Sequence, residues 1–301
     1  MVVSFLTRLA RASILSSMNQ LSTEKRAAVV AALVEGNSLR GTARLTGVSR
    51  MTIEKLLRDL GTACVAYHDA HVRGLKSQRI QCDEIWSFIG AKAKNVPEQK
   101  RGEWGDCWTW TAIDADSKLI VSYSIGPRNA AVAYDFMRDV ASRLTNRIQL
   151  TTDNFRLYLN AVDYAFGMDV DYAMLEKHYG AYVTSGSAAH RYTPAKITGV
   201  KAATITGSPD RKHVSTSYVE RQNLTMRMHM RRFTRLTNGF SKKIENHAHS
   251  VALHFMYYNF CKIHQSLRVT PAMEAGLTTC PWDLQDLVAL LDRSEVHGQS
   301  A

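Results

Sequence analysis

The sequence has no long apolar run, few prolines and no closely paired cysteines. No stretch approaches the roughly 20 apolar residues that a membrane-spanning helix needs, so we expect no membrane segment. The five cysteines show no C-x-x-C spacing, which argues against a zinc ribbon or a disulfide framework and favours reduced thiols in a cytoplasm. An apolar fraction of 45% over 301 residues is that of a globular protein with one large domain or two smaller ones.

Acidic residues are scarce in two parts of the chain. Residues 1–78 carry 11 basic and 5 acidic side chains, and residues 177–270 carry 15 and 3. Residues 79–176 carry 11 and 14, and residues 271–301 carry 1 and 5. Two basic zones therefore flank a mildly acidic middle. Because solubility alone does not require charges to segregate by sign, this distribution favours a polyanionic partner such as nucleic acid.

Three short helices are predicted in residues 23–61. The segments TEKRAAVVAALVEG, NSLRGTARLTG and VSRMTIEKLLRDLG have helical periodicity, and each ends at a glycine. Asn37 or Ser38 is an expected N-cap for the second helix, and Ser49 for the third. The third helix is predicted to stop at Gly61.

The second and third of these helices, joined at Gly47, have the arrangement of a helix-turn-helix. In such a motif the later helix enters the major groove of DNA. We therefore expect Arg50, Thr52 and Lys55, near its exposed leading end, to contact DNA. The alternative is a small three-helix bundle without this role.

The middle of the chain has a strand pattern. RIQCDEIWSFIG, CWTWTAIDA and KLIVSYSIG are predicted strands, NAAVAYDFMRDVASRLT is a helix, and RIQLTTDN begins with a short buried strand. Residues 180–215, rich in Gly, Pro, Ser and Thr, are expected to be extended or mobile, and residues 216–265 mostly helical. This order predicts an α/β or α+β domain with a mixed sheet flanked by helices.

Two aspartates stand at strand positions where ligands bind. Asp83 lies inside the first strand, where aspartate is disfavoured, and Asp153 follows directly after RIQLTT. Residues at strand ends of an α/β sheet can meet in space although 70 positions separate them. Alternatively, Asp83 is an edge-strand charge and Asp153 caps a helix. Glu84 is expected to point to the other face of the sheet and is a weak candidate for a supporting role.

A single acid, Glu220, lies within the basic segment TSYVERQNLTMRMHMRRFTR. Ser217 and Glu220 have the spacing of a capping box, which is the purely structural alternative. The following helix, however, would place Asn223, Arg227 and Arg231 near the same face as Glu220. Phosphate contacts are expected from five arginines of this segment: Arg221, Arg227, Arg231, Arg232 and Arg235.

Arginines beside carboxylates suit phosphodiester chemistry. Two Mg²⁺ ions can clamp the attacking and leaving oxygens of an in-line displacement. Mg²⁺ prefers a few carboxylates together with water and substrate oxygens. Asp83, Asp153 and Glu220 are therefore the predicted catalytic and metal-binding residues for two Mg²⁺ ions, with Mn²⁺ as a substitute.

At these residues the chain resembles the DDE transposases of the IS-one-like insertion-sequence group. The resemblance is carried by QCDEIWSFIGAK, GDCWTWTAID, RIQLTTDN, TSYVERQNLTMRMHMRRFTRLTNGFSKK and HFMYYNFCKIHQSL, and it covers roughly residues 18–280. It implies an RNase H-like catalytic domain whose DDE triad corresponds to Asp83, Asp153 and Glu220. Some relatives begin with a cysteine-rich zinc ribbon, which this sequence lacks.

The resemblance also implies a function. The expected protein binds terminal inverted repeats and target DNA, cleaves and joins DNA with Mg²⁺, assembles as a homo-oligomer, and works in the bacterial cytoplasm at the nucleoid. The expected domains are an extension without fixed structure, a helix-turn-helix, a linker or connecting helix, the catalytic domain and a tail, at residues 1–17, 18–62, 63–78, 79–265 and 266–301.

Two alternative functions stay open at this point. One is a transposase-derived DNA-binding regulator without catalysis, against which the presence of all three acids argues. The other is an RNase H-like nuclease or resolvase that cuts DNA without joining it.

Overall fold

A six-stranded sheet organises the middle of the chain in the computed structural model, which describes residues 21–180, 197–234 and 238–298. The strands run in the order β3-β2-β1-β4-β5-β6. Strand β2 is antiparallel to both of its neighbours, β1 and β3, while β4 and β5 run parallel to β1, and β6 is antiparallel to β5. Their bounds are Arg79–Ile89 (β1), Gly105–Asp114 (β2), Ile120–Gly126 (β3), Ile148–Asp153 (β4), Val170–Tyr179 (β5) and Ile197–Thr206 (β6). The expected mixed sheet is thereby confirmed.

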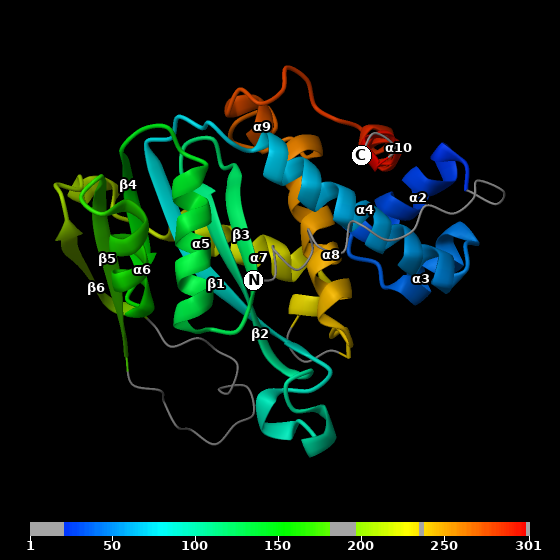
Figure 1. Cartoon of the computed structure of the whole chain (residues 1–301), viewed down its shortest axis with the longest axis horizontal. Coiled ribbons are helices and arrows are strands. Elements are labelled where there is room, and N and C mark those ends of the chain that lie inside the picture. The colour runs from blue at the N-terminus through cyan, green and yellow to red at the C-terminus, as the bar shows by residue number, and fades with distance from the viewer. Residues whose placement is uncertain (1–20, 181–196, 235–237, 299–301) are drawn as a thin grey trace.

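Helices cover both faces of this sheet (Figure 1). On one face, the buried Trp110 of β2 contacts the rings of Phe136 in α5 and Tyr158 in α6. On the other face, Tyr123 of β3 contacts Phe255 of α8. The helices are α2 (Thr23–Val34), α3 (Leu39–Thr46), α4 (Arg50–His71), α5 (Ala130–Ser142), α6 (Leu157–Phe166), α7 (Ser217–His229), α8 (Ile244–Met256), α9 (Pro271–Glu274) and α10 (Leu284–Gly298). In the described ranges, none of them is long and apolar enough to cross a bilayer.

Most predicted elements of the middle region are present. The three expected strands, the helix and the short strand after it correspond to β1, β2, β3, α5 and β4. The sequence reading did not identify β5, α6 or β6. Strand β6 lies within the segment 180–215, for which the expectation is an extended or mobile region, and residues 181–196 of that segment are outside the described residues.

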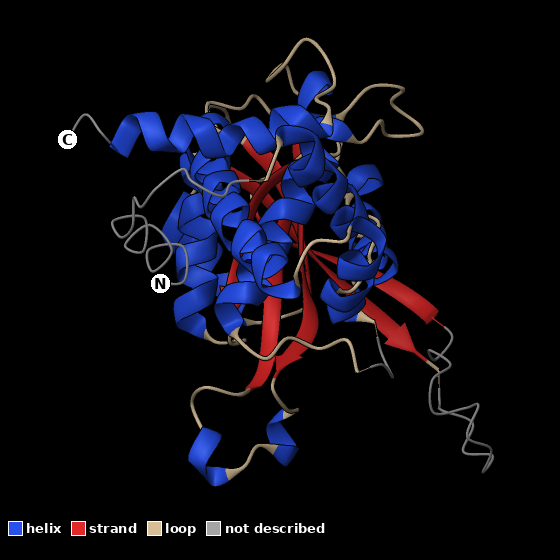
Figure 2. Cartoon of the chain, turned by 90° about the vertical axis from the view of Figure 1, so that its right-hand side faces the viewer, coloured by secondary structure: helices blue, strands red, loops and turns tan. Residues whose placement is uncertain are grey.

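The β1–β2 hairpin projects from the body as an arm (Figure 2). Its two strands stay paired from Ile80 with Asp114 out to Ile89 with Gly105. Two short 3-10 turns, Ala93–Asn95 and Glu98–Lys100, form its tip. Strand β1 therefore extends well past the end of β4, and one stretch of β1 has no parallel neighbour.

The three N-terminal helices form with the predicted caps. Ser38 accepts a hydrogen bond from the Gly41 N–H, and Ser49 accepts one from the Thr52 N–H. Gly47 ends α3 in the left-handed conformation at φ 68°. The expected caps at Ser38 and Ser49 are confirmed, and the DNA-binding role of this unit stays a prediction.

The predicted stop at Gly61 is wrong, because α4 continues to His71. Gly61 is instead a point of close approach between two helices. A Cβ atom at Gly61 would lie 2.4 Å from Cβ of His249 in α8. The glycine therefore serves the packing of α4 on α8, and residues 62–71 form the second half of α4, the connecting helix that was one of the two expectations for this segment.

The C-terminal segment is helical and adds to the core. Leu287 and Val288 of α10 are fully buried, and Arg26 of α2 lies 3.7 Å from the Asp292 carboxylate. Helix α10 thus packs on the N-terminal helices, so the name "tail" for residues 266–301 describes only their place in the chain. Residues 1–17, the expected extension, lie outside the described residues, and the division into domains stays a prediction.

Candidate active site

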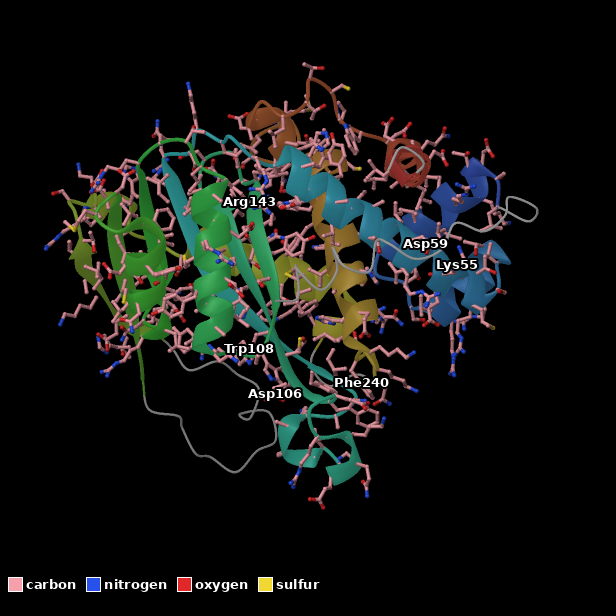
Figure 3. All side chains as sticks on the ribbon, in the orientation of Figure 1. Lys55, Asp59, Asp106, Trp108, Arg143 and Phe240 are labelled. Carbon is pink, nitrogen blue, oxygen red and sulfur yellow. The ribbon has the colours of Figure 1, made fainter. Side chains whose placement is uncertain are left out.

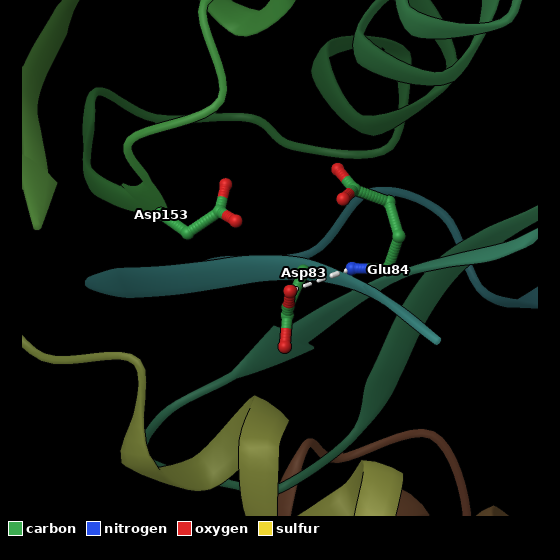
Figure 4. A group of neighbouring side chains, drawn as sticks. All are labelled: Asp83, Glu84 and Asp153. Atoms are coloured by element: carbon green, nitrogen blue, oxygen red, sulfur yellow. Dashed lines mark hydrogen bonds between the residues drawn. The ribbon is translucent and has the colours of Figure 1, made fainter. Parts of the chain in front are cut away.

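Asp83 and Asp153 lie side by side at the carboxyl edge of β4. Cys82 of β1 is in register with Thr152 of β4, so the next residue of each strand is an aspartate. Three carboxylate oxygens, one each from Asp83, Glu84 and Asp153, lie within 4.8 Å of one another. Figure 4 shows the Asp83 carboxylate on the side of the yellow helix α7, with those of Glu84 and Asp153 on the opposite side of β1. The two distant aspartates are thus brought together as the sequence predicts.

Asp83 is held from both sides. Its Oδ1 accepts the Glu84 backbone N–H at 2.8 Å, and its Oδ2 accepts an N–H of the Asn223 side chain at 2.8 Å. Burial, reinforced by the negative charges of Asp153 and Glu220, raises the pKa of Asp83 to about 7. Crowded acids of this kind are favourable positions for a cation, which would remove the cost of their ionisation.

Asp153 is half-buried at the end of β4. Its Oδ1 accepts the Phe155 backbone N–H at 3.2 Å, and its Oδ2 lies 3.8 Å from Nη2 of Arg128. Burial raises the pKa of Asp153, an effect that Arg128 opposes. Asp153 therefore begins the loop into α6 and faces the site at the same time.

The buried Glu84 forms an ion pair with the partly exposed Arg128 beside the aspartates. Glu84 Oε2 accepts from Nε of Arg128 at 3.2 Å, and the Glu84 side chain is 1% exposed. The guanidinium lies over the rings of Phe155 at 3.7 Å and Trp108 at 4.9 Å. Burial, with the charge of Asp153, raises the pKa of Glu84 to about 8. Because Arg128 lies near the carboxylates of both Glu84 and Asp153, it helps to hold the Asp153 side chain in place.

Glu220 reaches the site from the first turn of α7. It is exposed and forms an ion pair with Lys177 of β5. The Thr216 hydroxyl donates to the same Glu220 oxygen. The Glu220 charge contributes to the raised pKa values of Asp83 and Asp153, so the three acids share one electrostatic environment. In the described structure Glu220 is bound to Lys177 rather than grouped with the two aspartates.

A side chain of the sheet holds the start of α7. Gln81 Oε1 accepts the backbone N–H groups of Tyr218 at 2.9 Å and Val219 at 3.2 Å. Gln81 is two residues before Asp83 and therefore on the same face of β1. The predicted capping box is wrong in detail, because the N-cap is Thr216 and Ser217 is the first helical residue. Gln81 supplies the missing cap and ties Glu220 to the strand that carries Asp83.

The arginines of the basic segment do not lie on one helix face. Arg221 is exposed on α7, and Arg227 is half-buried. Helix α7 ends at His229, so the predicted continuation of its face to Arg231 is wrong. Arg231 and Arg232 lie in the 3-10 turn Arg231–Phe233, and Arg235 lies outside the described residues.

The predicted DNA contacts of the N-terminal unit are exposed at the start of α4. Arg50, Thr52 and Lys55 are all accessible. The Thr52 hydroxyl bonds to Ser49 at 2.8 Å, and Lys55 pairs with Asp59 at 2.7 Å (Figure 3). An exposed pair of this kind contributes little to stability, so Lys55 can exchange Asp59 for another anion at small cost.

Several residues of the site gave little signal in the sequence. Gln81 could have been found from the period of two in β1, since it precedes Asp83 by two residues. Arg128 and Lys177 reach the acids only through the folding of the β3–α5 connection and of β5. No local pattern marks either of them.

Comparison with known proteins points to insertion elements. No family model matches the sequence. The chain is distantly homologous to the insertion element iso-IS1n protein InsB of Shigella dysenteriae, with 25% identity over 169 residues, which are 56% of this chain and 86% of InsB. This homology confirms the resemblance to the insertion-sequence group.

Among solved structures, the chain has a weak similarity to the piggyBac transposase synaptic complex with hairpin DNA. The superposition covers 99% of this chain and 77% of that chain, at 12% identity and a TM-score of 0.35. At so low a score it contributes nothing to the assignment of site residues.

Proposed function

We propose that the chain is a DDE-type transposase of an insertion sequence, which binds the ends of its element and catalyses DNA cleavage and strand transfer. The observation that carries this proposal is the proximity of Asp83 and Asp153 at the carboxyl edge of β4, beside helix α7, which carries Glu220 in its first turn and leads into a cluster of arginines. The distant homology to an insertion-element protein supports it.

The donor set suits a hard divalent cation. Carboxylate oxygens are the ligands that Mg²⁺ prefers, and Mn²⁺ accepts the same set. Burial raises the pKa values of Asp83 and Asp153, and a cation between them would restore their charged forms. Asp83, Asp153 and Glu220 would hold two Mg²⁺ ions. Bound there, the ions would activate the attacking oxygen and stabilise the leaving oxygen.

The residues around the acids orient them. Asn223 fixes the rotamer of Asp83, and the Glu84–Arg128 pair supports Asp153. Lys177 neutralises Glu220 and must release it when Glu220 turns to a cation. Each of these partners comes from a different element, so the site is assembled by the fold as a whole.

The reaction is two successive phosphoryl transfers. Water attacks the phosphodiester at the element end, which leaves a 3′-hydroxyl and a 5′-phosphate and releases one proton. The 3′-hydroxyl then attacks a phosphodiester of the target, so one P–O bond forms as another breaks. The arginines at 221, 227, 231, 232 and 235 bind backbone phosphates, and Arg50, Thr52 and Lys55 position the end DNA. Joining two ends requires at least two subunits.

Strand transfer by wild type and Asp153→Asn tests this function. With Mg²⁺ and duplexes taken from the DNA that flanks the gene, the wild type joins ends to a target plasmid. The variant binds the same duplexes and does not join them. Equal joining by the variant contradicts the proposal. Wild-type cleavage without joining would define a nuclease or resolvase, and binding without either reaction a regulator.

A further inference from the structure

A cavity of about 600 Å³ lies between the N-terminal helices and the far end of α7. It is lined by α2, α3 and α4, by the turn after α7, by residues 238–243 and by α8. Phe240, which Figure 3 labels, lines it and packs on Phe88 at 5.0 Å between ring centroids. Six lining residues are cationic: Arg40, Arg50, Arg231, Arg232, Lys242 and Lys243.

This cavity is strongly electropositive. Glu54 is the one acidic residue among its lining residues in the described part of the chain. His229 and His254 also line it, but burial lowers the pKa of each, so both are neutral at pH 7. Six arginines and lysines thus stand against one carboxylate. Repulsion between these cations costs free energy, and an anion bound in the cavity would remove that cost.

Most of these cations are free to bind a ligand. Five of them, all exposed, form no ion pair or side-chain hydrogen bond with any other described residue: Arg40, Arg50, Arg231, Lys242 and Lys243. The side-chain amide of Asn246 donates a hydrogen bond to Oε1 of Glu54 at 2.8 Å. Glu54 therefore forms no ion pair with any of these five exposed cations.

The sixth cation, Arg232, is built into the wall. Its Nη1 donates to the Ser241 hydroxyl at 2.7 Å, and Ser241 bonds to Nδ1 of the buried His247 at 2.9 Å. Burial lowers the pKa of Arg232 to about 10, which still leaves the guanidinium charged at neutral pH. A fixed cation of this kind suits binding of a phosphate, because little side-chain freedom is lost.

Helix α7 joins this cavity to the acidic site. Glu220 stands in its first turn, and His229, its last residue, lines the cavity. Nine residues at 1.5 Å each span about 14 Å. At about 3.4 Å per base step, this is the length of about four base pairs.

The N-terminal helices are docked so that this spacing is fixed. A Cβ atom at Gly36, where φ is +82°, would lie 2.9 Å from the carbonyl oxygen of His229. Helix α4 packs along α8, beside which it lies in Figure 1. The start of α4 and the end of α7 therefore both form walls of one cavity.

We propose that this cavity binds backbone phosphates of one DNA strand, about four base pairs from the phosphodiester that reacts at the acids. It would connect the contacts of the helix-turn-helix to the active site along a single strand. The proposal rests on the function proposed above, and it adds Arg40, Lys242 and Lys243 to the DNA-binding residues. Because phosphates carry no base identity, binding here is independent of sequence.

Fluorescence anisotropy with a labelled 30-base-pair duplex of arbitrary sequence tests it, at 50 to 200 mM KCl. Arg40→Gln combined with Lys243→Gln removes two exposed, unpaired charges. Lys25→Gln combined with Lys76→Gln is the matched control, since both lysines are exposed and outside the cavity. The cavity variant loses about tenfold or more in affinity, and its slope of log K against log[salt] falls by about two. The control changes neither.

A gain of affinity provides a second arm. Glu54→Gln removes the acid of the cavity and keeps a carbonyl oxygen for Asn246, so it should bind the duplex several-fold more tightly. Unchanged affinity and slope in the cavity variant, or an equal loss in the control, would overturn the proposal. A wild-type preference for an RNA duplex of the same length would overturn the choice of DNA.

The failure of this proposal and that of the enzyme are separable. If the wild type joins DNA and the cavity variant still binds like the wild type, only the cavity assignment falls. If the cavity variant loses binding and the wild type never joins, the cavity stands and the transposase is wrong. Once cleavage has mapped the element end, ethylation interference should show sensitive phosphates about four base pairs from the cut, and these should disappear in the cavity variant.

Discussion

The two ends of α7 differ in charge and in what holds them. The first turn carries Glu220 and is seated on the sheet by Gln81, two residues from Asp83. The last turn leads to Arg231 and Arg232 and is seated against the N-terminal helices at Gly36. One helix of 13 residues thus joins a carboxylate cluster to a cationic cavity. A phosphodiester substrate needs cations for its backbone and acids for its metal ions. The two ends of α7 can meet these opposite requirements about 14 Å apart.

The two ends also depend on different parts of the chain. The acids come from β1, β4 and α7, and their neighbours from the sheet itself. The cavity needs α2, α3 and α4 to be docked on α8. We therefore expect changes at the first end to affect chemistry, and changes at the second to affect binding.

The largest expected effect separates these two classes of change. Glu220→Gln should lower the rate of strand transfer by a thousandfold or more, since a lost metal ligand costs several kcal/mol of transition-state stabilisation, at about 1.4 kcal/mol per tenfold. Its affinity for DNA should stay that of the wild type. Arg231→Gln should weaken DNA binding severalfold and recover its joining rate at saturating protein. Joining assays over a protein titration measure both, and the comparison fails if the two variants behave alike.

A smaller effect is expected from the seat of α7. Gln81→Met keeps the length of the side chain and removes the oxygen that accepts from Tyr218 and Val219. The expected cost is about 1 kcal/mol of unfolding free energy, in line with other N-caps. Because Glu220 is then less well placed, joining should fall by about 10- to 100-fold while DNA affinity is kept. A drop in stability without a drop in joining at saturating DNA would show that Gln81 acts only on the fold.

The last effect concerns how the stability of the metal-free protein depends on pH. Burial raises the pKa of Asp83 to about 7, above its ordinary value, so the folded state binds this proton more tightly than the unfolded state. Stability contributed by the proton is present at low pH and is lost as pH rises toward 7. Between pH 5 and 8, the wild type should lose about 2.7 kcal/mol relative to Asp83→Asn, because the loss runs over about two pH units, from 5 to the pKa, at 1.36 kcal/mol per unit.

Chemical denaturation at both pH values measures this difference, and the buried histidines cancel because both proteins contain them. Adding MnCl₂ at pH 8 should restore stability to the wild type and not to the variant, since a cation binds the ionised acids. A difference between wild type and variant that does not change with pH would contradict the raised pKa of Asp83.

Much of the fold and part of the site could be predicted from local signals. The strands follow their period of two, Ser38 and Ser49 cap their helices, and Asp83 and Asp153 stand out because aspartate is rare at such strand positions. Each of these signals lies within a few residues of the feature that it predicts. The sequence therefore sufficed for strands β1 to β4 and for the two aspartates.

Tertiary packing explains what the sequence reading missed. Gly61 has the features of a helix stop, but the contact with His249 overrides that local signal. Gln81, Arg128 and Lys177 act across the sheet on residues that are far away in the chain. The cavity joins Arg50 to Arg231 although 181 positions separate them, and no periodicity indicates such a contact.

The central claim is that Asp83, Asp153 and Glu220 share one cation site, and Fe²⁺-mediated backbone cleavage tests it most directly. Fe²⁺ takes the place of Mg²⁺ on oxygen ligands, and with ascorbate and peroxide it cuts the chain close to the bound ion. We predict cuts near residues 83, 153 and 220, all suppressed by excess Mg²⁺ and all lost in Asp153→Asn. Cuts near residues 83 and 153 without any near residue 220 would contradict the claim.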